Sequence, residues 1–343
     1  MSNSQTLLVT GGAGFIGGNF VRLLLATEPD VRIVNLDALT YAGNLASIRD
    51  CLEQRHHTFV RGDIANAELV RHLLQGHKIT GIINFAAESH VDRSITGPKV
   101  FIDTNVGGTL NLLWNARECG VKRFLQVSTD EVYGSLGDSG YFREDTPISP
   151  NSPYSASKAS ADHLVQAFHH TYGLDTVITR CSNNYGAWQF PEKMIPLMIR
   201  NAMADKPLPV YGDGLNVRDW LHVLDHCRAI WTAFSKGRAG QVYNVGGNSE
   251  KTNLDVVHTI LRGLGKPDSL ISFVKDRPGH DRRYAIDAGK IRRELGWEPQ
   301  MKFESGIRDT IAWYQANRAW MDEVTSGDYQ KYYDQMYGKR GQA

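Results

Sequence analysis

The start of the chain most constrains its fold. Residues 6–10 form a short apolar run, the glycine-rich run Gly11-Gly12-Ala13-Gly14-Phe15-Ile16-Gly17 follows, and residues 19–27 are amphipathic. Gly12, Gly14 and Gly17 match the pattern GxGxxG, and Gly11, Gly14 and Gly17 match its variant GxxGxxG. This order predicts a strand, a tight turn and a helix whose N-terminus can accept a pyrophosphate.

An acidic residue follows the second predicted strand. Residues 31–36 are mostly apolar and lead to Asp37, which lies 20 residues beyond Gly17. In dinucleotide-binding folds an acid at this distance hydrogen-bonds the adenosine ribose hydroxyls, and its charge would repel a 2′-phosphate. The sequence therefore predicts an NAD site rather than an NADP site.

The alternation of strand and helix then continues. Further short strands are predicted at residues 58–63, 81–85, 123–128 and 175–180, with a helix at 105–119. This pattern predicts an α/β fold, a Rossmann-type doubly wound parallel sheet with helices on both faces. Ligands of such sheets bind at the carboxyl ends of the strands. The residues expected at those ends are Gly11, Asp37, Asp63, Ala86 and Thr129.

The character of the sequence changes near residue 182, where polar and proline-containing segments begin. We expect residues 1–181 to form an NAD-binding Rossmann domain that carries the catalytic residues, and residues 182–343 to form a smaller C-terminal α/β lobe that binds substrate. Helices are predicted near residues 194–203, 224–235, 253–264 and 303–317, and a strand predicted at residues 241–245 is expected to return to the main sheet.

The fifth predicted strand delivers two adjacent acids to its carboxyl end, where Asp130 and Glu131 follow Thr129. After a loop rich in glycine, serine and proline, Tyr154 and Lys158 stand four residues apart, which places both on one face of a helix. A neighbouring ammonium favours phenolate, so we expect Lys158 to lower the Tyr154 pKa from about 10 toward the working pH. The cluster predicts proton transfer to and from a substrate beside the cofactor.

Composition excludes several classes of partner. The net charge of +1 indicates neither a nucleic-acid-binding nor a membrane-binding surface. No stretch approaches the roughly 20 apolar residues of a membrane span, and the short polar N-terminus does not resemble a signal peptide. The four scattered cysteines form no CxxC pair, as is typical of free thiols in a reducing cytoplasm, and no metal site is expected.

An anionic ligand would have to be held by local charge. Arg218 and Arg277 both lie in turn-rich segments of the second lobe, at residues 212–220 and 276–284. The planar fork of arginine suits phosphate oxygens. These two residues are therefore candidate ligands of a diphosphate.

Further motifs stand at residues 39–44, 86–94, 128–134, 183–186, 218–220 and 277–281. Together with the glycine-rich run and the Tyr154–Lys158 pair, they resemble the extended short-chain dehydrogenase/reductase family and, within it, the nucleotide-sugar 4,6-dehydratases, over roughly residues 7–315. The Thr-Asp-Glu triplet is the most specific motif, because related 4-epimerases have small polar residues in place of the acid pair. Two departures from the family pattern are Ala38, where a lysine is common, and Ala187-Trp188, where Pro-Tyr is usual.

The resemblance implies a hydro-lyase that converts dTDP-glucose into dTDP-4-keto-6-deoxyglucose and water, for the biosynthesis of deoxysugars such as dTDP-rhamnose. Tyr154 would take the 4-hydroxyl proton while hydride leaves C4 for NAD, with Lys158 holding the nicotinamide ribose and Thr129 hydrogen-bonding the oxygen. An ionised Glu131 would remove the C5 proton, and a protonated Asp130 would protonate the departing 6-hydroxyl. The hydride would return to C6, so NAD would stay tightly bound and be regenerated at each turnover.

The resemblance also assigns site residues. The catalytic residues would be Thr129, Asp130, Glu131, Tyr154 and Lys158. The cofactor-binding residues would be Gly11, Gly14, Phe15, Ile16, Gly17, Asp37, Leu39, Thr40, Asp63, Ile64, Ala86, Ala87, Ser89, Thr104, Tyr154, Lys158 and Asn183. The substrate-binding residues would be Ser89, His90, Thr129, Asn184, Glu192, Lys193, Pro209, Tyr211, Arg218, Asn253, Arg277 and His280. A homodimer is implied through helices near residues 105–119 and 154–172.

Three alternatives stay open at this point. A UDP-glucose 4,6-dehydratase would share the acid pair, and thymine differs from uracil by one methyl group, worth about 1–3 kcal/mol in a pocket. A nucleotide-sugar 4-epimerase would share the fold, Tyr154 and Lys158 but would not need Asp130 and Glu131. An NAD-sensing binding protein would keep the fold without catalysis, and a missing tyrosine or lysine would favour it.

Overall fold

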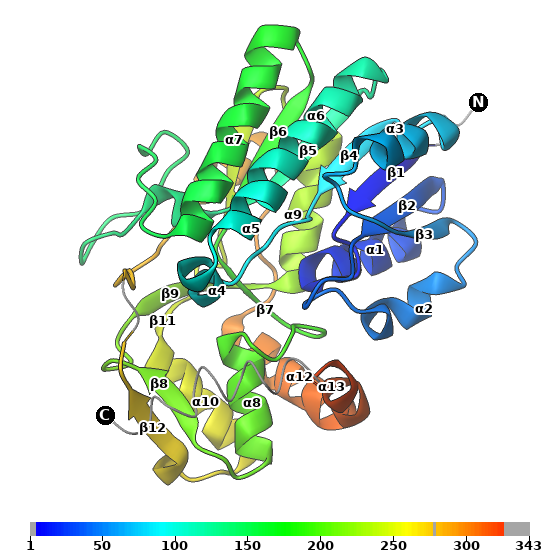
Figure 1. Ribbon diagram of the computed structural model, residues 1–343. Helices are drawn as coiled ribbons and strands as arrows, with labels where there is room; N and C mark the ends of the chain where they lie inside the picture. Colours follow the sequence, from blue (N-terminus) through cyan, green and yellow to red (C-terminus); the bar gives the residue numbers. More distant parts are fainter. Residues whose placement is uncertain (1–4, 277–278, 326–343) are drawn as a thin grey trace.

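The computed structural model describes residues 5–276 and 279–325. Its centre is a sheet of seven parallel strands in the order β10-β6-β5-β4-β1-β2-β3 (Figure 1). Counted from β3, the order 3-2-1-4-5-6 is that of a doubly wound dinucleotide-binding fold. The strands are β1 (Gln5–Thr10), β2 (Val31–Asp37), β3 (His57–Arg61), β4 (Gly81–Asn84), β5 (Arg123–Thr129), β6 (Thr176–Cys181) and β10 (Gln241–Val245). The predicted fold class is confirmed, and so is the return of residues 241–245 to the main sheet.

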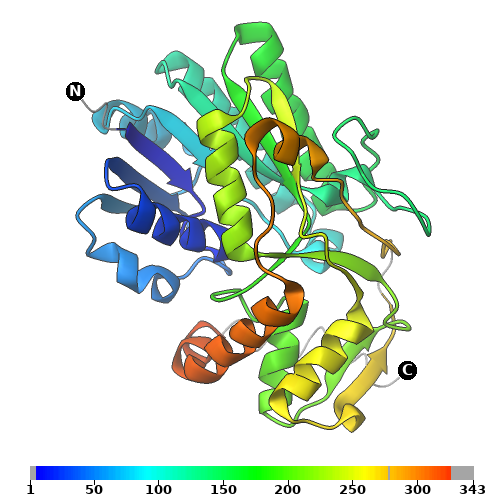
Figure 2. The same ribbon diagram turned by 180° about the vertical axis from the view of Figure 1, so that it is seen from behind.

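Helices cover both faces of this sheet. On one face lie α3 (Ala67–Gly76), α6 (Thr109–Glu118) and α7 (Pro153–Tyr172), which enclose a core with Leu8, Ile82 and Phe124 (Figure 1). On the other lie α1 (Phe15–Thr27), α9 (Val223–Lys236) and α11 (Gly289–Leu295), seen from behind in Figure 2. Because strands buried on both sides favour apolar residues, central strands such as β1 and β4 contain short hydrophobic runs, whereas the edge strand β3 is partly exposed.

Shorter elements connect these layers near the carboxyl ends of the strands. They are η1 (Leu45–Ile48), α2 (Arg49–Leu52), α4 (Val91–Thr96), α5 (Lys99–Phe101), η2 (Ile102–Gly108) and η3 (Asp130–Tyr133). The strand register brings Thr10, Leu36 and Asn84 into one row, so β1, β2 and β4 end at the same edge. A buried chain of hydrogen bonds from Thr10 through Asn84 to Gln126 crosses the strands just below that edge.

A second lobe lies beyond this edge (Figure 1). It holds the strand pair β8 (Leu208–Tyr211) and β12 (Ile271–Val274), and a three-stranded sheet of β7 (Asn183–Tyr185), β9 (Val217–His222) and β11 (Glu250–Thr252). Its helices are α8 (Met194–Met203), α10 (Asn253–Leu264), η4 (Asp268–Leu270), α12 (Phe303–Ala316) and α13 (Arg318–Val324). These elements share their own core, which includes Ile199, Trp220 and Ile260. The proposed division of the chain at residues 181 and 182 stays a prediction.

The helix predicted at residues 105–119 differs in detail. The helical path begins earlier, at α5, and passes through the π-helical segment η2 before α6. Such wide turns occur often at functional sites. Here the wide turn brings Asn105 against Glu88 and Ser157: its amide donates to the Glu88 carbonyl (3.0 Å) and to Ser157 Oγ (2.8 Å). Periodicity cannot distinguish this segment from an ordinary helix.

The part of the chain that the structure describes contains no helix that is both long and apolar enough to cross a bilayer.

Candidate active site

The glycine-rich turn joins β1 to α1 at the edge of the sheet. Gly11 has a φ of +70°, which favours glycine. A Cβ atom on Gly17 would lie 2.3 Å from the carbonyl oxygen of Gly11, so the helix can approach the turn only without a side chain. These glycines form the cradle that a pyrophosphate needs at a helix N-terminus.

Asp37 ties the ends of the first two strands together. Its carboxylate accepts hydrogen bonds from the backbone N–H groups of Ala13 and Leu39, each at 2.8 Å. Leu39 has a φ of +53°, so this contact shapes the loop that follows β2. Burial raises the pKa of Asp37, while the two backbone donors act in the opposite direction.

A cavity of about 310 Å³ opens along this edge between the two lobes. It is lined by all five predicted catalytic residues and by every predicted cofactor-binding residue except Leu39. Asp37, Asp63 and Ile64 lie at one end, and Tyr154 and Lys158 lie beside β5 and β6. The predicted cofactor and catalytic residues therefore surround one continuous space.

The acid pair leaves β5 in a short turn, η3. The Thr129 hydroxyl caps this turn by accepting from the Glu131 N–H at 3.2 Å, and it donates a long hydrogen bond to Asp130 Oδ1 at 3.4 Å. Asp130 is 1% exposed, and among the described residues its Oδ2 has no hydrogen-bond partner. Burial, with Glu131 and Asp219 nearby, raises the pKa of Asp130 well above its usual range.

Tyr154 and Lys158 occupy the first turns of α7. Ser152 caps this helix through a reciprocal pair of hydrogen bonds with Ser155, and Pro153 occupies its first position. Both site residues are buried, and Lys158 Nζ donates to the Val127 carbonyl of β5 at 2.7 Å. The helix thus presents the phenol and the ammonium to the cavity beside the acid pair.

The expectation that the Tyr154 pKa falls below 10 is not met in this structure. Burial, together with Glu131, raises the pKa of Tyr154 well above 10, and only the Thr129 hydrogen bond acts against this among the leading causes. Burial lowers the Lys158 pKa, although Asp162 one helical turn away favours its charged form. Desolvation is therefore the largest influence on the pKa of both residues.

The predicted substrate residues fall into two groups. Those on the cavity are Ser89, Thr129, Asn184, Glu192 and Lys193. His90, Pro209, Tyr211, Arg218, Asn253 and His280 do not line it. Of these, Tyr211 donates to Asp92 Oδ2 at 3.0 Å and its ring lies 6.1 Å from that of His280. Arg277 lies outside the described residues.

Arg218 is on a strand and not in the turn-rich loop that the sequence predicts. It belongs to β9, where it is 5% exposed and its guanidinium donates to the Asp281 carbonyl at 2.9 Å. Its guanidinium also stacks 4.4 Å from the centre of the Tyr284 ring. The pairing of β9 with β7 and β11 outweighs the local turn signals. In the same way, residues 183–185 form β7, although their polar sequence resembles a loop.

The cavity has lining residues that the sequence did not identify. Several directly precede or follow predicted ones in the chain, so the ends of the strands could have indicated them. They are Leu36, Ala38, Ala42, Gly43, Gly62, Phe85, Glu88, Val127, Ser128, Cys181, Ser182, Gln189 and Phe190. Gln189 and Phe190 reach the cavity only because their segment folds back over it, for which the sequence holds no periodic signal. Within residues 5–276 and 279–325, no group of His, Cys, Asp or Glu could hold a metal ion.

Comparison with known proteins decides the family. Residues 8–310 match the family described as GDP-mannose 4,6-dehydratase. The chain belongs to this family. A dTDP-glucose 4,6-dehydratase of Xanthomonas campestris pv. campestris (strain B100) is 58% identical, with 94% of this chain and 97% of that protein aligned.

Two similar solved structures are consistent with this assignment. A dTDP-glucose 4,6-dehydratase from Streptomyces venezuelae, solved with NAD and TYD bound, is 52% identical and has a TM-score of 0.91 over 93% of this chain and 100% of that one. A UDP-glucose 4-epimerase from Thermotoga maritima, solved with UDP-glucose, is 28% identical with a TM-score of 0.85, over 92% of this chain and 100% of that chain. The family prediction is confirmed, and the 4-epimerase is the more distant of these two structures.

Proposed function

We propose that this chain is an NAD-dependent dTDP-glucose 4,6-dehydratase, a hydro-lyase that forms dTDP-4-keto-6-deoxyglucose and water for deoxysugar biosynthesis. The observation that carries the proposal is the buried Asp130 beside Glu131, at the end of β5 and against Tyr154. Two neighbouring carboxyl groups with different environments can divide the duties of acid and base. The identity to named dTDP-glucose 4,6-dehydratases supports the choice of substrate.

The cavity fits a dinucleotide. The side-chain-free cradle at Gly11 and Gly17 suits its pyrophosphate, and Asp37 lies where an adenosine ribose would be held. Thr40, Asp63, Ile64, Ala86, Ala87, Thr104 and Asn183 would complete its walls. When bound, NAD would supply the oxidation at C4 and the later reduction at C6 of the sugar. Relatives solved with NAD bound support this cofactor.

The proton transfers fall to residues of the chain. Tyr154 takes the proton of the 4-hydroxyl, while Thr129 hydrogen-bonds the same oxygen and Lys158 holds the nicotinamide ribose. Once C4 is a ketone, Glu131 removes the acidified C5 proton. Asp130, kept protonated by its burial, gives its proton to the departing 6-hydroxyl. Each group lines the same cavity, as one active site requires.

Substrate contacts follow the two groups of residues. We assign Ser89, Asn184, Glu192 and Lys193, which line the cavity, to the sugar side of the ligand. We assign the diphosphate and base to the second lobe, with Arg218 as an anion ligand and His90, Pro209, Tyr211, Asn253 and His280 as further candidate contacts. Arg277 stays a candidate from the sequence, outside the described residues. The base preference is a separate proposal and rests on the named relatives.

Mass spectrometry on dTDP-glucose and UDP-glucose incubated in parallel tests both proposals. Loss of one water from dTDP-glucose alone supports the reaction and the base. Loss from both nucleotides keeps the reaction but refutes the base preference. A galacto isomer without water loss would indicate the 4-epimerase instead, and would leave Asp130 and Glu131 without a role.

Replacement of Gly17 by alanine should empty the cofactor site. The new Cβ would meet backbone atoms of Gly11 and Gly12 at 2.3–2.9 Å, and backbone cannot move aside as a flexible side chain does. Overpacking costs about 1–3 kcal/mol, so we expect NAD affinity to fall by tenfold or more. NAD bound per chain after gel filtration measures this. Gly76→Ala, where nothing lies within 4 Å, is the matched control, and equal NAD content in the two variants would contradict the prediction.

We also propose a homodimer. Large apolar side chains stand exposed along α5 to α7, at Val100, Ile102, Leu110, Trp114 and Tyr172. Trp114 and Tyr172 pack edge to face at 6.5 Å and join α6 to α7 into one surface. A contiguous exposed apolar surface is typical of an interface. Trp114→Glu should place charge in it and yield monomers in sedimentation velocity; a monomeric native protein would refute the proposal.

A cytoplasmic location is proposed as well. The four cysteines are free thiols in the structure, as is usual in a reducing compartment. Fractionation of cells that express the protein tests this, and recovery in a membrane or secreted fraction would contradict it.

A further inference from the structure

A short segment of the second lobe folds over the cavity. Residues 187–193, here called the strap, connect β7 to α8. Gln189, Phe190, Glu192 and Lys193 of the strap line the cavity. The strap is therefore one of the walls between a bound dinucleotide and solvent.

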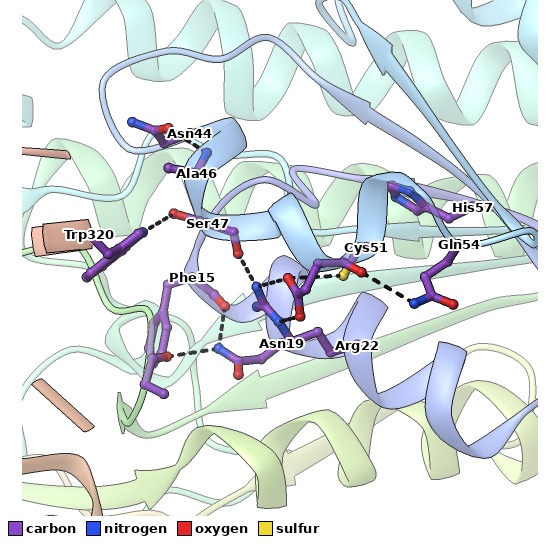
Figure 3. A network of polar contacts seen from close by, with 12 residues as sticks. Phe15, Asn19, Arg22, Asn44, Ala46, Ser47, Cys51, Gln54, His57 and Trp320 are labelled. Carbon is purple, nitrogen blue, oxygen red and sulfur yellow. Dashed lines mark hydrogen bonds and ion pairs between the residues drawn. The ribbon is translucent and has the colours of Figure 1, made fainter. Parts of the chain in front are cut away.

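The first end of the strap is fixed on α1. Asn19 Nδ2 donates to the carbonyls of Phe15 (2.9 Å) and Ala187 (3.0 Å), which joins the strap to the helix of the glycine-rich turn (Figure 3). Trp188 lies under the Arg22 guanidinium at 4.3 Å and packs against Trp320 at 5.3 Å. Arg22 and Trp320 both bond Ser47, so this end is held from several sides (Figure 3).

The other end of the strap is held by two side chains from distant parts of the chain, Tyr41 and Arg93, through Glu192 of the strap. Arg93 Nε of α4 pairs with Glu192 Oε2 of the strap at 3.3 Å. The same guanidinium stacks 4.0 Å from the centre of the Tyr41 ring, in the loop after β2. The Tyr41 ring also lies 6.2 Å from the ring of Phe190 in the strap. We call Tyr41, Arg93 and Glu192 the latch.

The latch joins the walls of the cavity to one another. Thr40 and Ala42 beside Tyr41, Ser89 just before α4, and Glu192 itself all line the cavity. The Glu192 side chain is 3% exposed, whereas that of Arg93 is 26% exposed, so the carboxylate lies on the inner side and the guanidinium at the solvent side. A dinucleotide in the cavity would have to separate these walls to leave. Opening them would separate the buried Glu192 carboxylate from Arg93 and leave Lys193 as its neighbouring cation, and the loss of an ion-pair partner by a buried charge is costly.

We propose that Tyr41, Arg93 and Glu192 act as positioning residues that retain the dinucleotide in its site through each turnover. The inference rests on the proposed function, because a reaction that oxidises C4 and later reduces C6 needs the same reduced cofactor for its last step. Loss of the cofactor between these steps would leave an oxidised sugar and an inactive chain. Slow dissociation of the cofactor is therefore part of catalysis.

Arg93→Met removes the charge and the stacking guanidinium but keeps a long apolar side chain. NAD-loaded protein is mixed with excess isotopically labelled NAD, without substrate, and exchange is followed by native mass spectrometry. Ion pairs and cation–π contacts at such sites are worth enough to make exchange about tenfold faster or more. Arg238→Met, which removes an Arg–Glu pair beside β10 and away from the cavity, is the control and should exchange at the native rate.

A second readout separates retention from general damage. Under turnover, the Arg93→Met protein should lose activity progressively, release NADH into solution and recover when NAD is added. Tyr41→Leu opens the latch from the opposite wall and should behave like Arg93→Met. With two variants, the test can still be read if one of them fails to fold. Exchange at the native rate in a folded variant overturns the proposal. Exchange is measured without sugar, so a failure of the retention proposal would leave the proposed reaction untouched. The proposed reaction is tested separately, by the product that the native protein forms.

Discussion

Asp130→Asn should stop water loss while it spares oxidation of the sugar at C4. An amide has nearly the shape of the carboxylic acid but cannot give a proton to the 6-hydroxyl. General acid catalysis contributes about 10²–10⁴-fold, so elimination should slow by that factor. With dTDP-glucose, the variant should accumulate reduced nicotinamide, seen by its near-ultraviolet absorbance, because the next step is blocked. Equal loss of oxidation and elimination would contradict the role assigned to Asp130.

The same variant should be at least as stable as the native protein at neutral pH. Burial raises the folded pKa of Asp130, so the folded state keeps a proton that the unfolded chain releases above a pKa near 3.9. The Asp130 carboxyl group therefore contributes fully to the stability of the folded state in acid, and this contribution is lost as the pH rises toward the folded pKa. The amide never ionises and avoids this loss. Thermal unfolding of both proteins at pH 4 and pH 8 measures this difference in stability. The variant should be more stable than the native protein at pH 8, and the difference should vanish at pH 4.

Tyr154→Phe should lose both the oxidation and the overall reaction. The ring still fills its place between α7 and β5, but no group remains to take the 4-hydroxyl proton. A loss of about 10²–10⁴-fold is expected, without accumulation of reduced nicotinamide, which distinguishes this variant from Asp130→Asn. Stopped-flow absorbance with dTDP-glucose compares the two. Rapid cofactor reduction by the phenylalanine variant would refute the assignment of Tyr154 as the base.

The pH dependence of oxidation by the native protein also tests the role of Tyr154 as the base. Burial and Glu131 raise the Tyr154 pKa, and the base must be deprotonated to act. The rate of oxidation should therefore rise with pH below that pKa. Lys158→Met removes the nearby cation and should move the rising part of the pH–rate profile to higher pH. The profile of kcat/KM for the two proteins measures the shift, and identical profiles would show that Lys158 does not assist ionisation.

Much of the fold could be predicted because local and global signals agree. The central strands of the main sheet are buried on both faces and contain short apolar runs, and turn glycines and helix caps mark their limits. Asp37 and Thr129 both line the cavity because parallel strands end at one edge of the sheet. The register places Asp37 one residue and Thr129 three residues beyond the row of Leu36 and Gln126. The same rule predicted the cavity-lining residues at Gly11, Asp63 and Ala86.

The second lobe was less accessible to sequence reasoning. Its strands are short, and β7 and β9 are defined by partners far along the chain. Arg218 therefore appeared to lie in a loop. The strap is positioned by Asn19, Arg22 and Arg93, which lie about 100 to 170 residues earlier in the chain, and no local pattern encodes such contacts. The high pKa of Tyr154 escaped prediction because the sequence shows charges but not burial.

The proposed reaction moves one hydrogen within a single sugar, and this is its central claim. dTDP-glucose deuterated at C4 is incubated with the protein in ordinary water, and the product is examined by mass spectrometry and NMR. The account predicts loss of one water, with the deuterium retained on C6 and a proton from solvent at C5. Deuterium lost to solvent, or deuterium returned to C4 without loss of water, would contradict it.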